Sequence, residues 1–404
     1  MRILIATLSR NLLGGVEKYL QTIIPELLGR RHSIGLLYEY PSDREQVGID
    51  SGLDLASWCP GELGVDSTLK SIRAFAPDIV YSQGIDNGML EQTLLDTYPA
   101  ALYAHSYWGT CVTGCKIHAL PRIEPCGRRL GPSCLLLYYP RRCGGLNPRT
   151  MWKLYQIQSQ RRSRLADYQA VLVASRHMQR EYQRHGVSAE RLRLIPLPID
   201  ENSGGLPSLP RRSLGSRILF VGRLMDVKGG DYLLRAIPLA ATKLARPLYL
   251  TIAGDGPERG RLENLSRQLG LSVEFTGWTN NNVRNDLMRQ TDLLAVPSLW
   301  PEPFGMVGVE AGRFGVPAVG FAVGGIPDWL IPGQTGELAP GDPPTVEGLA
   351  QALVRALADA QHHQKLSSGA WEFAKQFSLE HHLAQLEQVL SARTSAAQMM
   401  PSIV

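Results

Sequence analysis

Two glutamates flank a glycine-containing turn in the second half of the chain, within residues 299–310. The turn follows an apolar strand that ends near Val296, so it lies at the carboxyl edge of a parallel sheet, where open α/β folds bind ligands. Glu310 offers a carboxylate to the vicinal hydroxyls of a ribose, and a helix that begins near Gly305 offers free N–H groups to phosphate or sugar oxygens. We therefore expect one pocket formed by Glu302, Phe304, Gly305, Met306, Val307 and Glu310.

Two cationic side chains stand at the start of the same half. Arg223 follows the strand at residues 217–222 directly, and Lys228 lies in a loop that leads into a helix. Arg presents a planar fork to two phosphate oxygens, and Lys presents a compact charge. Together they predict a diphosphate site in which the charge that develops on a leaving nucleotide diphosphate is stabilised.

A glycine pair follows the first strand of the chain. Residues 3–6 are apolar, Gly14 and Gly15 come further on, and apolar residues then recur at helical spacing from Val16 to Leu27. A glycine loop that leads into a helix suits a bound anion. An ordinary tight turn uses the same residues, so the pair is weak evidence by itself.

Strands and helices alternate along both halves, which predicts an α/β fold with two Rossmann-like domains that face each other across a cleft. We expect an N-terminal domain at 1–200, a linker rich in Ser, Gly and Pro at 201–214, and a C-terminal domain at 215–378. A helix at 379–394, which crosses back to the N-terminal domain, and a polar tail at 395–404 complete the chain.

The basic residues are unevenly distributed. Eleven Lys and Arg side chains lie between Lys116 and Arg164 against one acid, Glu124. Such a segment suits phosphates of lipid headgroups, of a lipid-diphosphate acceptor or of nucleic acid, although a solvated surface has the same composition. Apolar runs are too short to span a bilayer, and the N-terminus resembles a buried strand, so we expect a cytoplasmic protein, peripheral on the inner face of a membrane.

Five of the six cysteines lie in the same region, in an insertion at about 106–148. Their spacing is irregular and lacks the paired C-x2-C pattern of zinc knuckles. The segment is therefore compatible either with packed, free thiols or with a structural metal site at Cys111, Cys115, Cys126, Cys134 and Cys143.

Several of these motifs together resemble the retaining glycosyltransferases with the two-domain GT-B fold, the family-four-like or group 1 glycosyltransferases. The resemblance rests on residues 14–17, 221–224, 228–229, 253–257 and 302–310 and extends over nearly the whole chain. It implies that Arg223 and Lys228 bind the donor diphosphate and that Glu310 holds the ribose. It also implies that Glu302, together with the backbone of residues 304–307, contacts the transferred sugar. It also implies that Gly15 faces the phosphates and that His105 reaches the sugar, although Ser106 follows His105 where the family often has an acidic or amide residue.

The resemblance implies a metal-independent enzyme that uses a nucleotide-diphosphate sugar, needs no cofactor and retains the anomeric configuration by front-side attack. The acceptor would be a hydroxyl of a glycan, of a lipid-linked molecule or of a small molecule, as in polysaccharide biosynthesis. The alternative is a non-catalytic protein that binds phosphoglycan or nucleic acid through the basic, cysteine-rich segment, although no specific nucleic acid is expected.

Overall fold

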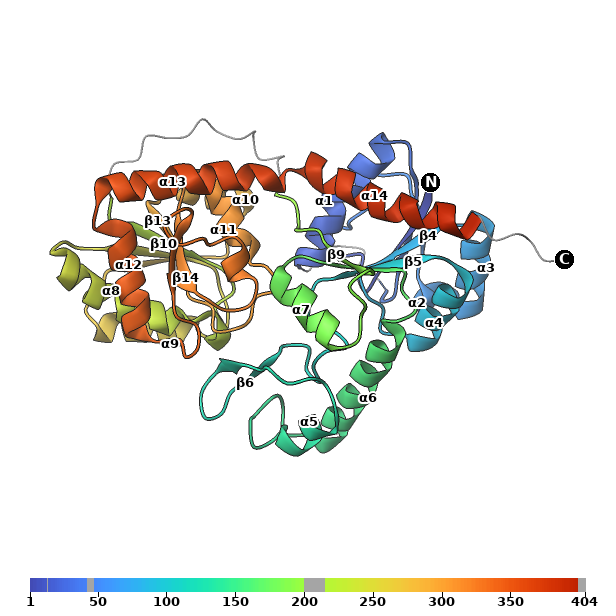
Figure 1. Ribbon diagram of the computed structural model, residues 1–404, viewed down its shortest axis with the longest axis horizontal. Helices are drawn as coiled ribbons and strands as arrows, with labels where there is room; N and C mark the ends of the chain where they lie inside the picture. Colours follow the sequence, from blue (N-terminus) through green and yellow to red (C-terminus); the bar gives the residue numbers. More distant parts are fainter. Residues whose placement is uncertain (13, 42–46, 200–214, 399–404) are drawn as a thin grey trace.

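The computed structural model of the chain describes residues 1–12, 14–41, 47–199 and 215–398, and they form two α/β domains that each contain a parallel sheet (Figure 1). The two Rossmann-like domains predicted from the sequence are thus confirmed. The predicted linker at 201–214 lies outside the described residues.

The N-terminal sheet has the strand order β3-β2-β1-β4-β5-β8-β9, and all its pairings are parallel. Its five inner strands are buried on both faces, which is why they consist of short apolar runs. The strands of the sheet are β1 (Arg2–Thr7), β2 (Ser33–Tyr38), β3 (Ala56–Trp58), β4 (Ile79–Ser82), β5 (Ala100–Ala104), β8 (Ala170–Val173) and β9 (Leu192–Leu194).

Helices cover both faces of this sheet. One core joins Ile3 and Ile5 to α1, and the other joins Leu4 and Ala6 to α4 and α7. The helices of this domain are α1 (Gly15–Gly29), α2 (Pro60–Leu63), α3 (Val65–Phe75), α4 (Gly88–Thr97) and α7 (Arg176–Arg184).

The C-terminal sheet has the order β12-β11-β10-β13-β14-β15 and is also parallel. Its strands are β10 (Arg217–Val221), β11 (Tyr249–Ala253), β12 (Val273–Gly277), β13 (Leu293–Val296), β14 (Ala318–Phe321) and β15 (Gly336–Ala339). The accompanying helices are α8 (Gly230–Leu244), α9 (Arg259–Gln268), α10 (Asn281–Gln290), α11 (Met306–Gly312), α12 (Val346–Leu357) and α13 (Ala360–Ala374).

The strand order reverses at β1/β4 in the first domain and at β10/β13 in the second. Loops diverge from the carboxyl ends of such strand pairs, and the crevice between them is where open sheets bind ligands. The loop after β1 leads to Gly14 and Gly15, the loop after β10 carries Lys228, and the loop after β13 carries Glu302. The topology therefore brings the predicted site residues of each domain to the crevice of its own sheet.

The last helix, α14 (Leu379–Gln398), follows the C-terminal domain in the chain but contacts α1. Leu383, Leu386 and Leu390 are fully buried in the core that Ile3 and Ile5 share with α1. Figure 1 shows α13 and α14 running in sequence from one domain to the other.

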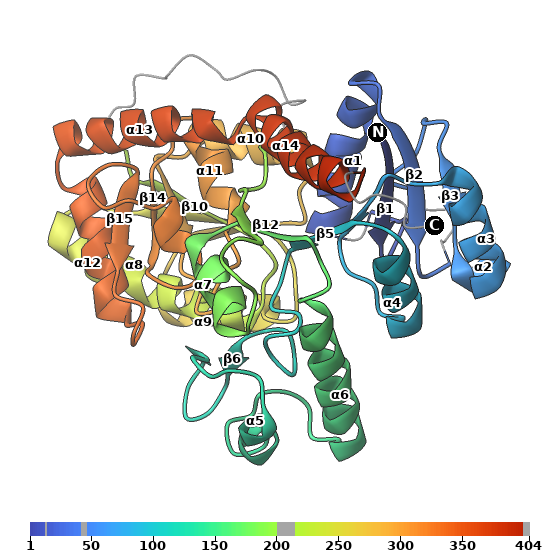
Figure 2. The same ribbon diagram turned by 45° about the vertical axis from the view of Figure 1, so that its right-hand side comes forward.

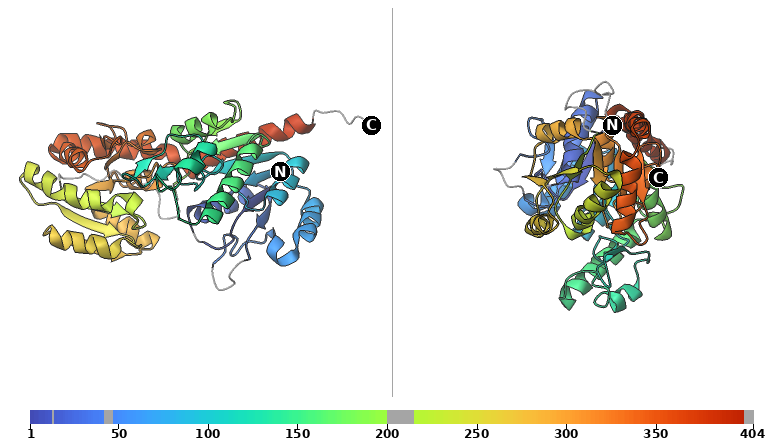
Figure 3. Two further views of the ribbon diagram at one scale, coloured as in Figure 1. Left: turned by 90° about the horizontal axis from the view of Figure 1, so that it is seen from below. Right: turned by 90° about the vertical axis from the view of Figure 1, so that its left-hand side faces the viewer.

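A separate lobe projects between β5 and β8, and we call residues 106–164 the cysteine-rich lobe (Figures 2 and 3). It contains the two-stranded ribbon β6 (Ile117–His118) and β7 (Glu124–Pro125), α5 (Pro132–Leu137) and α6 (Pro148–Arg164). Val112, Leu130 and Tyr138 form its small core, and Asn147 caps α6. No helix in the described part of the chain combines the length and the apolar character that a membrane span requires.

Candidate functional site

The C-terminal domain contains a hollow in which most of the predicted residues meet, and we call it the inner hollow. Its polar side chains come from the loops after β10 and β13 and from α10 and α11, and they are Lys228, Arg284, Ser298, Glu302 and Glu310. The backbone of Gly222 and of residues 305–307 also lines it. The structure thus brings Lys228, Glu302 and Glu310 to one hollow.

Lys228 and Glu302 form an ion pair across the two loops. Lys228 Nζ lies 2.5 Å from Glu302 Oε1, and Ser298 Oγ donates to the same oxygen at 2.6 Å. Glu302 is only 7% exposed, so its charge depends on these partners. Sequence reasoning placed both residues at one edge of the sheet but did not predict that they pair.

Gly229 lets the two loops approach closely. Its φ is +68°, and a Cβ there would lie 2.0 Å from the carbonyl oxygen of Pro297. The amide of Leu299 donates to Val227 O at 2.8 Å and joins the loops. A larger residue at position 229 would separate the loops and with them Lys228 and Glu302.

Arg284 on α10 is a site residue that sequence reasoning missed. Its Nη1 lies 3.5 Å from Glu310 Oε2, and about four-fifths of each side chain is buried. Arg284 lines the inner hollow and also the two hollows next to it, which are described below as the interdomain hollow and the outer hollow. It therefore adds a cation where the three hollows meet. The only available signal was an arginine on the helix that follows Gly277 and Trp278, which is too common a pattern to single out.

Gly305 and Phe304 play different parts in the turn before α11. Gly305 has φ of +90° and lines the inner hollow at the start of the helix, as expected. Phe304 does not line it, because its ring is buried beside Phe377 and its carbonyl accepts a hydrogen bond from Trp329 Nε1 at 2.7 Å. The ring therefore belongs to the core, and the contact of the Phe304 backbone with the sugar, which the resemblance implies, stays a prediction.

A second hollow lies between the two domains, and we call it the interdomain hollow. Gly15, Tyr19 and His105 line it from the N-terminal domain, and Met306, Glu310 and Arg284 line it from the C-terminal domain. The structure thus brings His105 to the cleft opposite Glu310, as the sequence predicted. Gly15 is open to this space, since a Cβ there would meet nothing within 4 Å.

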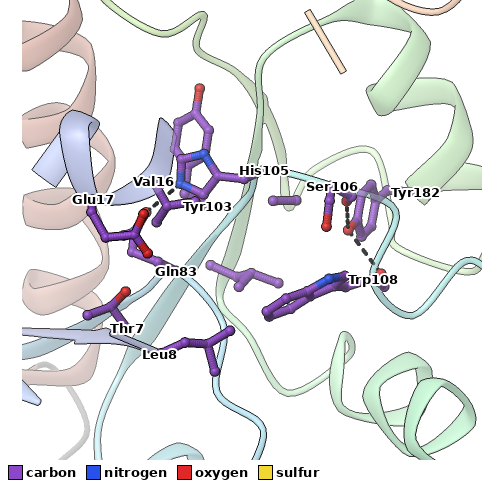
Figure 4. Close-up of a pocket in the computed structure, with 12 residues that line it drawn as sticks. Thr7, Leu8, Val16, Glu17, Gln83, Tyr103, His105, Ser106, Trp108 and Tyr182 are labelled. Atoms are coloured by element: carbon purple, nitrogen blue, oxygen red, sulfur yellow. Dashed lines mark hydrogen bonds between the residues drawn. The ribbon is translucent and has the colours of Figure 1, made fainter. Parts of the chain in front are cut away.

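His105 is held in a buried, uncharged environment. Its Nε2 pairs with Gln83 Oε1 at 2.7 Å, and its ring packs 4.6 Å from the ring of Tyr103 (Figure 4). Burial, with a smaller contribution from nearby His382, lowers the pKa of His105 to about 3. The imidazole is therefore neutral at physiological pH. Because an amide oxygen only accepts, Nε2 carries the proton and Nδ1 remains an acceptor.

A smaller pocket adjoins His105 inside the N-terminal domain, and we call it the N-terminal pocket. Glu17, Gln83, Ser106 and Trp108 face it together with Thr7 (Figure 4). Its volume of about 210 Å³ is below the range of drug-sized sites, so it suits a group of about one ring. Gln83 Nε2 is buried and has no hydrogen-bond partner among the described residues.

Arg223 lies apart from Lys228, in an outer hollow that it shares with Gly14, Gly15 and the largely exposed Trp278. The outer and inner hollows have Val221, Gly222 and Arg284 in common. The two predicted cations therefore line adjoining spaces rather than one. Gly14 has an extended backbone, so its φ does not itself require glycine.

The cysteines do not form a metal site in the structure. Within the described ranges, no group of three or more His, Cys, Asp or Glu side chains is placed to hold a metal ion. Cys115 and Cys134 instead donate to the carbonyls of Thr113 and Arg129, each at 3.6 Å. Burial raises the pKa of Cys143 to about 11, so that thiol stays protonated. The geometry favours packed thiols, the other interpretation that the sequence left open.

Two parallel α/β domains that meet at a charged crevice define the class of protein, and solved structures share this arrangement. HepE from Anabaena in complex with UDP has a TM-score of 0.70 and 21% identity, with 97% of this chain and 100% of that chain covered. Sucrose-phosphate synthase from Thermosynechococcus elongatus has a TM-score of 0.71 and 21% identity, with 98% and 100% covered. The fold is the GT-B fold.

The family models match both halves of the chain. Residues 13–203 match the model described as Glycosyltransferase Family 4, and residues 210–373 match the model described as Glycosyl transferases group 1. The chain therefore belongs to the glycosyltransferases of the family 4 and group 1 type.

Curated relatives match over shorter stretches. A D-inositol 3-phosphate glycosyltransferase from Corynebacterium aurimucosum is 33% identical over 191 residues, which are 44% of this chain and 45% of the relative. An uncharacterized glycosyltransferase from Methanocaldococcus jannaschii is 42% identical over 123 residues, which are 29% of this chain and 31% of the relative. The matches thus span less than half the length of these relatives.

Proposed function

We propose that this chain is a retaining glycosyltransferase that moves a sugar from a nucleotide diphosphate to an acceptor hydroxyl without a metal ion. The observation that carries the proposal is the inner hollow, where Lys228, Glu302 and Glu310 meet beside the backbone of residues 305–307. The family to which the chain belongs and the UDP complex of a protein with the same fold support a nucleotide-sugar donor.

In this proposal Lys228 binds the donor diphosphate and Arg223 reaches it from the adjoining outer hollow. A phosphate oxygen would replace Glu302 as the partner of Lys228, and Glu302 would then accept from hydroxyls of the transferred sugar. Glu310 would accept from the ribose hydroxyls, and Arg284 would hold its carboxylate in place. The donor thereby replaces the ion pair between Lys228 and Glu302 with contacts to the ligand, and the pair between Arg284 and Glu310 is kept.

The reaction breaks the bond between the anomeric carbon and the phosphate oxygen and forms a bond to the acceptor oxygen on the same face. The acceptor proton passes to the departing phosphate, so no protein group needs to form a covalent intermediate. Lys228 and Arg223 stabilise the charge that grows on that phosphate. His105, neutral and with Nδ1 as an acceptor, orients a sugar hydroxyl rather than transferring a proton.

The non-catalytic alternative is not favoured. A protein that only bound phosphates through the cysteine-rich lobe would not need Lys228, Glu302, Arg284 and Glu310 arranged in one hollow of the other domain. Removing several charged side chains from water costs free energy. A ligand with complementary charges and hydroxyls offsets that cost.

The test is a panel of nucleotide sugars, with thermal stabilisation and release of the nucleotide diphosphate as readouts. A bound donor raises the melting temperature by mass action whatever the acceptor is. We expect one donor to stabilise the wild type and to be hydrolysed slowly, and Lys228→Ala and Glu310→Ala to lose both effects. Lys243→Ala and Glu347→Gln, exposed positions of the same domain, serve as controls. Absence of any response to every donor would refute the proposal.

A further inference from the structure

The far end of the cysteine-rich lobe exposes three large apolar side chains. We call residues 132–153, which comprise α5, the start of α6 and the loop between them, the lobe tip. Leu136 on α5 is 79% exposed, Leu146 in the loop is 68% exposed and Trp152 in α6 is 51% exposed. Figures 1 and 2 show α5 and the adjoining end of α6 at the point of the molecule farthest from both sheets.

This exposure is not a result of a poorly packed lobe. Tyr138 is 1% exposed, and Met151, Leu154 and Tyr155 pack against the core that it forms with Val112 and Leu130. The ring of Trp152 stacks with that of Tyr155 at a centroid distance of 6.0 Å, so its position at the surface is fixed. The lobe therefore forms a core from other apolar side chains, and Leu136, Leu146 and Trp152 remain exposed to solvent.

Charge surrounds these apolar groups and has one sign. From residue 125 to residue 166 the chain has nine Lys and Arg residues and no Asp or Glu. Near the base of the lobe, Arg161 pairs with Asp86 and Arg164 pairs with Glu91, both in the N-terminal domain. At the lobe tip, Arg142, Arg149 and Lys153 are exposed, and none forms an ion pair with a described residue.

We propose that the lobe tip docks on an anionic membrane surface. Leu136, Leu146 and Trp152 would enter the boundary between headgroups and acyl chains, where the amphipathic indole is favoured. Arg142, Arg149 and Lys153 would remain at the level of the lipid phosphates. A nucleic acid would engage the cations alone and would leave the three apolar side chains in water. The combination of both features in one exposed segment at the end of the lobe is what selects a bilayer.

The experiment is co-sedimentation of the full chain with vesicles of phosphatidylcholine alone and of phosphatidylcholine mixed with phosphatidylglycerol. One variant removes the apolar groups (Leu136→Ser, Leu146→Ser and Trp152→Ser) and another removes the charges (Arg142→Gln, Arg149→Gln and Lys153→Gln). Matched controls are Leu63→Ser with Val65→Ser, and Lys70→Gln with Arg73→Gln, which are exposed positions of α2 and α3 in the same domain.

We expect the wild type and the controls to bind the mixed vesicles, and salt to weaken that binding. Each tip variant should lose at least about tenfold in partitioning, since each cation near an anionic surface contributes about a factor of five. Donor stabilisation measured without vesicles should be the same in all variants, so failure of docking and failure of the proposed reaction are separable. Equal binding to neutral vesicles, unchanged binding of the tip variants, or binding of duplex DNA in preference to mixed vesicles would overturn the proposal.

Discussion

The two walls of the cleft recognise a ligand by different means. On the C-terminal side the polar groups are paired ions, Lys228 with Glu302 and Arg284 with Glu310. On the N-terminal side Glu17 and Lys18 also line hollows, but the group opposite Glu310 is the buried, neutral imidazole of His105, which Gln83 holds. The charged wall suits a diphosphate and a ribose, and the neutral wall suits sugar hydroxyls, which need orientation rather than charge. The comparison predicts that substitutions on the charged wall act mainly through ionic stabilisation and those on the neutral wall through geometry.

The largest effect should come from Lys228→Ala. It removes the cation of the inner hollow and leaves Glu302, which is 7% exposed, without its counter-ion. We expect turnover to fall by about 100-fold or more, the cost typical of losing one group that stabilises charge in a transition state. This loss is measured from steady-state rates with the donor that the panel of nucleotide sugars identifies. Arg223→Ala should cost less, because Arg223 is exposed and lies in the adjoining hollow; equal losses would remove the distinction between the two cations.

Glu310→Gln should weaken donor binding by about tenfold to a hundredfold, because hydrogen bonds to a charged group contribute about 1.5–3 kcal/mol. Arg284→Gln should give a smaller loss, since Arg284 acts by holding the Glu310 carboxylate. Donor titration followed by calorimetry measures both, and the double variant should be no worse than Glu310→Gln alone. Strictly additive losses would show that Arg284 contacts the donor independently of Glu310.

His105→Asn should lower turnover by about tenfold, the smallest effect on activity among these sites, because it changes orientation and no charge. Since the pKa of His105 is lowered to about 3, the wild-type rate should show no inflection from this group between pH 5 and 8. Profiles of kcat/KM against pH for the two proteins should run parallel. An inflection near pH 6.5 that disappears in the variant would contradict a neutral role.

Much of the architecture was predictable because apolar runs and glycine loops specify parallel strands and the edge at which they end. The strand ending at Val296 and the cations after Val221 sufficed to place Lys228, Glu302 and Glu310 together. The strands β3, β9 and β15 were not predicted, since a polar or charged residue interrupts each of these short segments and leaves no apolar run.

The pairings across the site were beyond the reach of the sequence. Arg284 on α10 meets Glu310 on α11, two helices that are separated by a strand in the sequence, and Gln83 meets His105 because they follow the neighbouring strands β4 and β5. The contact of the Phe304 backbone with the sugar stays a prediction, and the motif did not indicate that the Phe304 ring packs beside Phe377. Sequence order indicates which loops share an edge but not which side chains meet there.

A prediction about stability extends the comparison beyond the site. His382 on α14 accepts from Tyr19 and donates to the Pro196 carbonyl, and burial lowers its pKa to about 4. The unfolded chain takes up a proton below about pH 6.5, so this stability is complete above that value and is lost as the pH falls toward 4. From pH 7.5 to 5 the loss should be on the order of 2 kcal/mol.

Thermal unfolding across this pH range measures the effect, with a fall of several degrees expected for the wild type. His382→Gln keeps a donor and an acceptor but does not titrate, so its melting temperature should depend less steeply on pH. An unchanged slope in the variant would show that other groups, such as His105, account for the acid sensitivity.

The cysteine-rich lobe of the N-terminal domain also touches the loop that carries Glu302. Tyr107 donates its hydroxyl proton to the Pro301 carbonyl, and the Trp300 indole donates to the Cys115 carbonyl at 2.6 Å. Lys228 Nζ in turn lies 5.1 Å above the Trp300 ring. The helix α14 already joins the domains on one side, and these contacts form a second connection between them. A hinge-like separation of the domains must therefore break one of the two connections. Exchange of the lobe between homologues would therefore have to carry Trp300 and Pro301 with it to preserve the geometry of the opposite domain.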